Sequence, residues 1–407
     1  MEVLYPRCAG LDVHKDLVVA CARIAEGRRV DTEIREFGTT TSELLALLDW
    51  LSSYRVTHVA MESTGVYWKP IWHVLEDSFT LVLGNAKQMK TVPGRKSDQK
   101  DAAWIADLQA HGLIRPSFVP PQPIQELRDL TRTRKQFVRE RTRHVQRIQK
   151  VLEDANVKLA SVLTDITGIS GRRILDALVR GERDPVKMAN LVHPTVKAPR
   201  DQIARALDGK VTEHHRFMLR LHLRHIGAIE VEVQVLEEQI QKALEPFRNA
   251  VELVLTHPGI GPDAAASIIA EIGVNMSVFS SADHLVSWGC LSPGLNETGG
   301  KKKSSPTKRA KWLKATMTQC AWAATHKRDS YMCAQYNRIK ARRGKKKAIV
   351  AVGATILRDI YHMLVNNAPY QELGSDFYDR RNRERSARRL VQRLQKMGYN
   401  VDLRMAA

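Results

Sequence analysis

The sequence predicts an α/β domain at the N-terminus, followed by a middle region of two long helices and a mainly helical C-terminal region. Strand and helix signals alternate up to about residue 115. A stiff proline-rich segment, FVPPQPI at residues 118–124, then marks a boundary. After it the hydrophobic period changes from 2 to 3.5. We therefore predict domains at residues 1–117, 124–250 and 251–370, with a basic tail at 371–407.

The first domain is predicted to run in the order three strands, helix, strand, helix, strand, helix. Residues 8–12 and 17–23 form a hairpin, and residues 30–37 alternate as a half-buried third strand should. A capping box, TTSE, precedes an amphipathic helix. Further short strands follow at residues 56–61 and 79–83. In this kind of order, polar residues at strand ends converge on one edge of the sheet.

Two long helices are predicted from apolar residues spaced alternately three and four apart, over residues 138–162 and 226–247. Their shared a/d period indicates an antiparallel or intermolecular coiled coil. The first helix is crowded with cations and has almost no compensating acids, so these cations form either a solvated face or a nucleic-acid contact. They are Arg132, Arg134, Lys135, Arg139, Arg141, Arg143 and Arg147.

The composition favours a cytoplasmic, nucleic-acid-binding protein. The 407 residues carry a net charge of +20, so a polyanion is the expected partner. The N-terminus lacks the apolar stretch of a signal peptide, and the longest apolar run, residues 348–357, is too short to span a membrane. Five scattered cysteines without a C-x-x-C pair argue against a disulfide framework or a structural zinc site.

Four acids of the first domain are predicted to form a metal site. Asp12 lies at the end of the first strand and Glu62 closes the fourth, while Asp98 and Asp101 stand three apart at the start of a helix. Singly, each acid is also explained as a helix cap or a loop residue. Together they would repel one another without a divalent cation, and hard oxygen ligands select Mg²⁺ or Mn²⁺.

The motifs around these acids resemble the DEDD transposases of the insertion-sequence-110 family. They are GLDVHK at residues 10–15, MESTGVYW at 61–68 and RKSDQKD at 95–101. The resemblance covers most of the chain and implies a RuvC-like N-terminal domain with the RNase H fold, a coiled coil and a C-terminal transposase domain. It also implies a DNA recombinase directed by a structured bridge RNA. By position, Asp12, Glu62, Asp98 and Asp101 would bind Mg²⁺.

A helix-hairpin-helix turn is predicted at residues 255–261, LTHPGIG. Gly259 and Gly261 would let backbone N–H groups approach a phosphate, and the second helix would offer its N-terminus to the anion. A plain turn between two helices is the alternative. The same segment is present in the family that the chain resembles.

A second family motif is similar to residues 288–303, WGCLSPGLNETGGKKK. In the family, the serine five residues after the proline is the nucleophile that joins DNA covalently, and here that position is Thr298. Either Thr298 attacks, or Ser304 or Ser305 replaces it, or this copy is impaired; we favour Thr298. The surrounding cations would then bind the scissile phosphate and its neighbours, although a disordered basic loop explains them too. They are Lys301, Lys302, Lys303, Lys308, Arg309 and Lys311.

The predicted function is a Mg²⁺-dependent transposase that acts on DNA as a homo-oligomer, a dimer or a tetramer, with a guide RNA as a further expected partner. One alternative is a RuvC-like nuclease or junction resolvase that uses the acids for hydrolysis alone. The other is a nucleic-acid-binding protein without catalysis, whose acids only brace the sheet.

Overall fold

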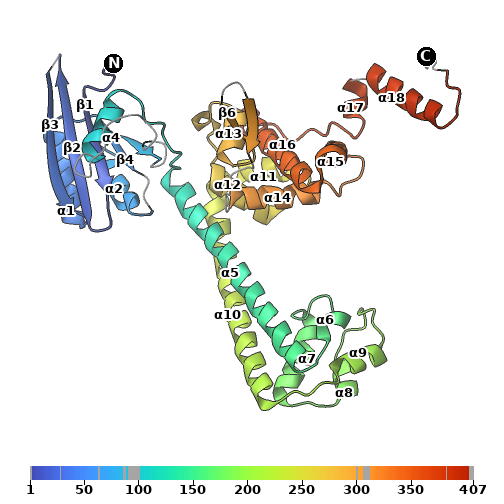
Figure 1. The fold of residues 1–407 in the computed structure, drawn as a ribbon. Coiled ribbons are helices and arrows are strands. Elements are labelled where there is room, and N and C mark those ends of the chain that lie inside the picture. Colours follow the sequence, from blue (N-terminus) through green and yellow to red (C-terminus); the bar gives the residue numbers. More distant parts are fainter. Residues whose placement is uncertain are drawn as a thin grey trace. The chain divides into compact units, whose positions relative to one another are not determined.

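The computed structural model describes residues 2–402, apart from 28, 63–64, 86–88, 90–100, 299–300, 306–311 and 382. Within it the chain divides into two compact units, Met1–Val119 and Pro120–Ala407. Figure 1 shows the sheet of the first unit and the long helices of the second. The α/β N-terminal part and the mainly helical remainder that the sequence predicts are confirmed.

The first unit contains a mixed five-stranded sheet in the order β3-β2-β1-β4-β5. Strand β2 pairs antiparallel with both β1 and β3, whereas β1, β4 and β5 are parallel. The chain order of strands and helices is the predicted one. The elements are β1 (Arg7–Val13), β2 (Leu17–Glu26), β3 (Arg29–Gly38), α1 (Thr41–Ser53), β4 (His58–Glu62), α2 (Trp68–Leu75), β5 (Thr80–Gly84) and α4 (Asp101–Ala110).

Helices cover both faces of this sheet. On one face, apolar side chains of α1 and α2, such as Leu47 and Ile71, pack with the inward side chains of the strands to form the main core. On the other face, α4 lies directly on β1 at Gly10. A Cβ atom at Gly10 would come within 2.3 Å of the backbone of Ala102 and Ala106, so only glycine allows this close approach.

Two local predictions for this unit are wrong. The third strand, β3, is exposed over its first eight residues rather than half buried, because it pairs on one side only and forms the edge of the sheet. The capping box does not form either. Thr40 is the N-cap of α1 without a side-chain cap, and Glu43 instead accepts a hydrogen bond from the backbone N–H of Gly38 at 3.3 Å.

The second unit is built on two long helices, α5 (Gln122–Asp154) and α10 (Glu213–Leu244). Its remaining elements are α6 (Leu159–Val162), α7 (Ile169–Arg180), α8 (Pro185–Ala189), α9 (Arg200–Leu207), η2 (Glu245–Phe247), α11 (Arg248–Leu255), α12 (Pro262–Ile272), η3 (Met276–Val278), α13 (Ala282–Trp288), β6 (Gly294–Thr298), β7 (Lys301–Ser305), α14 (Leu313–Ala324), α15 (Tyr331–Arg343), α16 (Lys345–Asn366), α17 (Phe377–Arg381) and α18 (Arg383–Lys396).

The long helices pack antiparallel within the chain. Arg134 bonds to Glu237 while Asp154, further along α5, bonds to His215, which lies earlier on α10. The prediction that the first helix continues to residue 162 is wrong. Helix α5 ends at Asp154 because Asn156 adopts a left-handed conformation with φ of 56°, which asparagine tolerates better than most residues.

Histidines pack between α5 and α10 in the middle of this pair. His144 Nδ1 lies 3.2 Å from His222 Nδ1, and the His144 and His225 ring centroids are 5.0 Å apart. Burial lowers the pKa of His144 and of His222, and the neighbouring histidines and Arg147 lower both further. Each of these effects favours the neutral form of the two rings, which reduces charge repulsion at the helix contact.

Helix α16 forms the centre of the C-terminal helices. At 22 residues, it is the helix among the described residues that is long and apolar enough to cross a membrane by length and composition alone. Its side chains at Val352, Ile356, Leu357 and Ile360 are buried, and it packs against α11, α13, α14 and α15. This burial identifies α16 as a core helix.

Candidate active site and nucleic-acid interface

Asp12 and Glu62 lie side by side on the sheet. The parallel register pairs Leu11 of β1 with Met61 of β4, so that Asp12 and Glu62 are the next residue on each strand. Leu11 and Met61 are buried in the core below α1 and α2. Because successive side chains of a strand alternate between faces, Asp12 and Glu62 point to the opposite face, which α4 covers.

Asp101 is the first residue of α4, and its position depends on Gly10. The backbone of Ala102, the next residue, is the part of α4 that lies against Gly10. Gly10 precedes Asp12 by two residues and therefore faces the same side of β1. The close packing at Gly10 thus brings the start of α4 to the part of the strand that holds Asp12.

The chemistry of these donors fits a divalent cation. Carboxylate oxygens are the ligands that Mg²⁺ and Mn²⁺ prefer, and the Asp12 side chain keeps 18% of its surface exposed for substrate to reach. His14 Nε2 lies 3.2 Å from Asp12 Oδ2. Asp98 lies outside the described residues. Among those that are described, no three His, Cys, Asp or Glu side chains are grouped as ligands of one metal ion, so the four-acid centre stays a prediction.

Thr298 belongs to the second unit and ends strand β6. Its backbone pairs with Lys301 of β7, so that the predicted nucleophile and the first predicted phosphate-binding lysine flank the tip of a hairpin. Lys302 and Lys303 continue along β7. The other predicted cations of this loop, Lys308, Arg309 and Lys311, lie outside the described residues.

In the segment predicted as a helix-hairpin-helix, a turn joins α11 to α12, which both the motif and a plain turn between two helices would give, and the two glycines of the turn differ in role. Gly259 has φ of 84°, and a Cβ there would lie 2.5 Å from the backbone N of Ala324, so α14 covers it. At Gly261, which is the N-cap of α12, no described atom lies within 4 Å of such a Cβ. Gly259 is thus explained by packing, whereas Gly261 leaves the backbone open to a phosphate.

His257 ties this turn to α16. Its side chain is buried, with Nδ1 at 2.9 Å from the Pro258 carbonyl oxygen and Nε2 at 3.3 Å from Asp359 Oδ2. Its ring also packs on Tyr370 at a centroid distance of 4.3 Å. The buried His257 side chain therefore connects the turn between α11 and α12 to Asp359 of α16 and to Tyr370.

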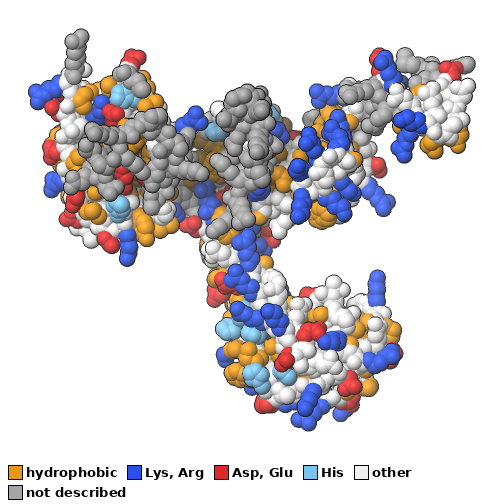
Figure 2. Space-filling model, in the orientation of Figure 1, with side chains coloured by type: hydrophobic (Ala, Val, Ile, Leu, Met, Phe, Trp, Pro, Cys, Tyr) orange, Lys and Arg blue, Asp and Glu red, His pale blue; other side chains and the backbone are white. Residues whose placement is uncertain are grey.

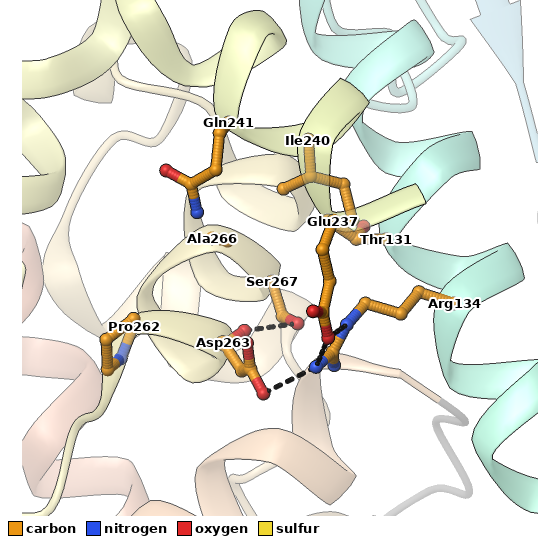
Figure 3. Close-up of a pocket in the computed structure, with 9 residues that line it drawn as sticks. All are labelled: Thr131, Arg134, Glu237, Ile240, Gln241, Pro262, Asp263, Ala266 and Ser267. Carbon is orange, nitrogen blue, oxygen red and sulfur yellow. Dashed lines mark hydrogen bonds and ion pairs between the residues drawn. The ribbon is translucent and has the colours of Figure 1, made fainter. Parts of the chain in front are cut away.

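The expectation that the cations of the first long helix lack acidic partners is wrong. Arg132 makes two bonds to Glu271 of α12, at 2.8 and 2.7 Å. Arg134 donates to Glu237 of α10 at 2.9 Å and to Asp263 of α12 at 2.8 Å. Figure 3 shows Arg134 between these two acids in a small pocket where α5, α10 and α12 meet.

Three more cations of α5 are also engaged within the chain. Arg141 bonds to Glu230 of α10 at 2.8 Å, and Arg139 lies over the Trp312 ring at 5.1 Å. Lys135 donates to the Thr316 hydroxyl, and burial lowers the pKa of its ammonium group. Of the seven cations that the sequence singles out on this helix, Arg143 and Arg147 alone have no hydrogen bond, ion pair or ring contact with another described residue.

The Arg132–Glu271 pair gives the first testable prediction. Glu271 is only 5% exposed, and Arg128 donates to its backbone oxygen at 2.7 Å beside the pair. Glu271→Gln would remove the counter-charge of two partly buried guanidinium groups, Arg128 and Arg132, at a cost of about 3 kcal/mol, the lower end of the range for breaking a buried pair. We expect calorimetry to show the melting temperature of the second unit lowered by roughly 5–10 °C. Asp263→Asn, at a site whose side chain is 73% exposed, is the control and should change it by less than about 3 °C. Equal shifts would contradict the prediction.

Comparison with known proteins identifies the class and then the family. A model for the DEDD transposases of the IS110 family, described as "Transposase", matches residues 9–157. A second, described as "Transposase IS116/IS110/IS902 family", matches residues 251–337. Both define a transposase, and together they cover more than half of the chain. The chain belongs to the IS110 family of transposases.

Two individual proteins are similar to this chain. The "Insertion element IS900 uncharacterized 42 kDa protein" of Mycobacterium paratuberculosis is 25% identical over 335 residues, which are 71% of this chain and 80% of that protein. The solved structure of RuvC from Thermus thermophilus is also similar, with 15% sequence identity and a TM-score of 0.21. The match covers 27% of this chain and 99% of the RuvC chain.

Two features of the folded chain could not be singled out from the sequence. Gly10 stands in the GLDVHK motif, but its contact with α4 depends on residues more than 90 positions away. Trp322 has no local pattern that would separate it from a core tryptophan. The exposure of its side chain is a property of the folded chain.

Proposed function

We propose that this transposase moves its insertion element by Mg²⁺-dependent cutting and joining of DNA strands. Asp12, Glu62, Asp98 and Asp101 hold the metal, and Thr298 is the nucleophile. The observation that carries the proposal is the position of Asp12 and Glu62 on adjacent parallel strands, each directly after the paired residues Leu11 and Met61, on the face where α4 begins. Two acids so placed fit a cation better than a role in bracing the sheet, which needs no charge at this position.

The chain's own residues have separate tasks in this chemistry. The Thr298 hydroxyl attacks the phosphorus, its Oγ–P bond forms, and the P–O bond to the departing strand breaks while the departing oxygen gains the proton. The four acids position the cation, which when bound would stabilise charge on the phosphate. The hydroxyl of a second DNA strand then displaces Thr298, and the threonine recovers its proton.

A guide RNA and a homo-oligomer complete the proposal. The net charge of +20 is enough for RNA and DNA together. On α10, Val231 and Val235 are 62% and 47% exposed and four residues apart, so they share a face, and Val138 of α5 is 41% exposed. A second copy covering these side chains would extend the helix pair into an intermolecular coiled coil. The complex would act in the cytoplasm, where the element's DNA lies.

Strand exchange by the purified protein tests the function. We expect a discrete RNA to co-purify, and we expect exchange between the element end and its target to require that RNA and Mg²⁺. Exchange that persists after ribonuclease treatment would remove the guide RNA but keep the recombinase. Cleavage without any exchange would favour the nuclease hypothesis, which the separation of the acids and Thr298 into two units also allows.

A further inference from the structure

The turn between α15 and α16 is a strongly basic surface that the site above does not use. Between Asp329 and Asp359 the sequence contains no acid. Figure 2 shows lysine and arginine side chains gathered over α15. We call this cluster the basic hairpin; all seven of its side chains are exposed: Arg338, Lys340, Arg342, Arg343, Lys345, Lys346 and Lys347.

The basic hairpin differs from Arg132, Arg134 and Arg141 of α5, because its cations have no acidic partner among the residues that the structure describes. Five of its seven side chains, Arg342, Arg343 and Lys345 to Lys347, make no ion pair or hydrogen bond with any residue that the structure describes. Lys345, Lys346 and Lys347 also form the first turn of α16, where the helix dipole adds positive charge. The folded chain therefore keeps a repulsive group of charges together, which a polyanion would relieve.

Trp322 of α14 lies next to this surface. Its side chain is 51% exposed, although tryptophan is usually well covered. Its ring makes edge contacts with Tyr336 of α15 and His326, at centroid distances of 6.4 and 5.2 Å. Tyr336 is itself buried, and Lys340 Nζ lies 5.6 Å from its ring centroid. Trp322, Tyr336 and Lys340 thus form a continuous row that leads from an exposed indole to the basic hairpin.

An exposed, fixed aromatic ring beside a track of cations is what a single nucleic-acid strand requires. Unpaired bases stack on aromatic side chains, while the flanking phosphates contact lysine and arginine. A duplex hides its base faces and would use the cations alone.

Resting on the proposed function, we propose that Trp322 and the basic hairpin bind a single-stranded segment of nucleic acid. One unpaired base stacks on the Trp322 indole, and the neighbouring phosphates lie along Lys340 and the lysines that begin α16. An unpaired loop of a guide RNA and a DNA strand released during exchange share this chemistry.

Photocross-linking tests the site directly and separates these two sources. The full-length protein is irradiated in the presence of single strands of about 12 nucleotides that contain 5-iodouracil, one of RNA and one of DNA. The matching duplex is tested in the same way, and all samples lack Mg²⁺. We expect a cross-link at Trp322, mapped by mass spectrometry, with one or both single strands and none with the duplex. The strand that cross-links better is the physiological type. Cross-links that map elsewhere, or equally to the duplex, would overturn the proposal.

Affinity measurements supply matched controls. Trp322→Ala should weaken single-strand binding about tenfold and leave duplex binding unchanged, while Trp322→Phe should keep most of the affinity. Lys345→Gln, Lys346→Gln and Lys347→Gln together should reduce the salt slope by about 2. Lys187→Gln, Lys197→Gln and Lys210→Gln together remove the same charge from exposed sites between α7 and α10. This control variant should change neither the single-strand affinity nor the salt slope. Equal losses in the two triple variants would contradict the site.

Two further measurements separate loss of binding from loss of folding, and this proposal from the proposed function. If Trp322→Ala lowers the melting temperature, Trp322→Phe and the cross-link map still decide, since both keep an aromatic ring at this position. Repeating the binding with Asp12→Asn separates the two proposals. Binding should be unchanged in that variant even if strand exchange proves not to be the activity of the protein.

Discussion

Asp12→Asn is expected to abolish Mg²⁺-dependent cleavage of the element's ends, with a fall in rate of about 10³-fold or more. A bound cation contributes several kcal/mol of charge stabilisation, and each 1.36 kcal/mol is a factor of ten in rate. Asparagine keeps the shape of the side chain but removes the negative charge that the cation needs. Cleavage of a supercoiled plasmid carrying the ends, followed over time by gel electrophoresis, measures the effect.

The same hairpin offers a matched control for this change. Asp16 lies in the exposed turn between β1 and β2, so Asp16→Asn removes an equal charge four residues away and should leave the rate unchanged. Added Mg²⁺ should raise the melting temperature of the wild-type protein and of Asp16→Asn, but not that of Asp12→Asn. An Asp12→Asn protein that still cleaves at the wild-type rate would leave Asp12 without a catalytic role. No cleavage by either the wild-type protein or the variant would favour the binding-protein hypothesis.

The order of elements in the first unit could be predicted because its signals are local. Period-2 alternation and short apolar runs identify strands within about eight residues, and the helix between β3 and β4 has its own apolar face. The exposure of β3 could not be predicted. It depends on which strands pair with it, and the sheet order places β3 at the edge. Asn156, which ends α5, likewise acts through backbone conformation rather than through hydrophobic period.

The cations of α5 show why a charged stretch is ambiguous in sequence. Arg132 finds Glu271 139 positions away, and Arg134 finds Glu237 103 positions away. Pairs so far apart in the chain cannot be recognised from a local stretch of sequence. The run at residues 338–347 has similar composition but stays exposed and without acidic partners among the described residues. The fold, not the composition, decides which basic stretch is free to bind nucleic acid.

The pairing of Asp12 with Glu62 could be predicted because the carboxyl ends of parallel strands meet at one edge of a sheet. The register of β1 with β4 places the two acids side by side, as that reasoning expects. The path from these acids to Thr298 could not be predicted in the same way. They belong to different units, and nothing in the local sequence sets the distance between them.

Thr298→Ala is expected to abolish the covalent protein–DNA complex and strand joining, on the order of 10³-fold or more, as removal of a nucleophile does in other enzymes. Thr298→Ser should retain joining, and we expect it to be faster. Serine keeps the hydroxyl but lacks the γ-methyl group, which restricts χ1 and crowds in-line attack. Denaturing gels of protein trapped on labelled suicide substrates measure the complex, and the strand-exchange assay measures joining.

The other hydroxyls of the hairpin distinguish the remaining explanations. Ser304 and Ser305 lie on β7, paired with Leu295 and Gly294 at the far end of the hairpin from Thr298. Their alanine variants should therefore form the covalent complex at the wild-type rate. If Thr298→Ala still forms the complex and Ser304→Ala or Ser305→Ala does not, that serine is the nucleophile. If Thr298→Ala cleaves at the wild-type rate and no variant forms a complex, the acids act by hydrolysis, because a hydroxyl nucleophile cannot release DNA without first being bound to it.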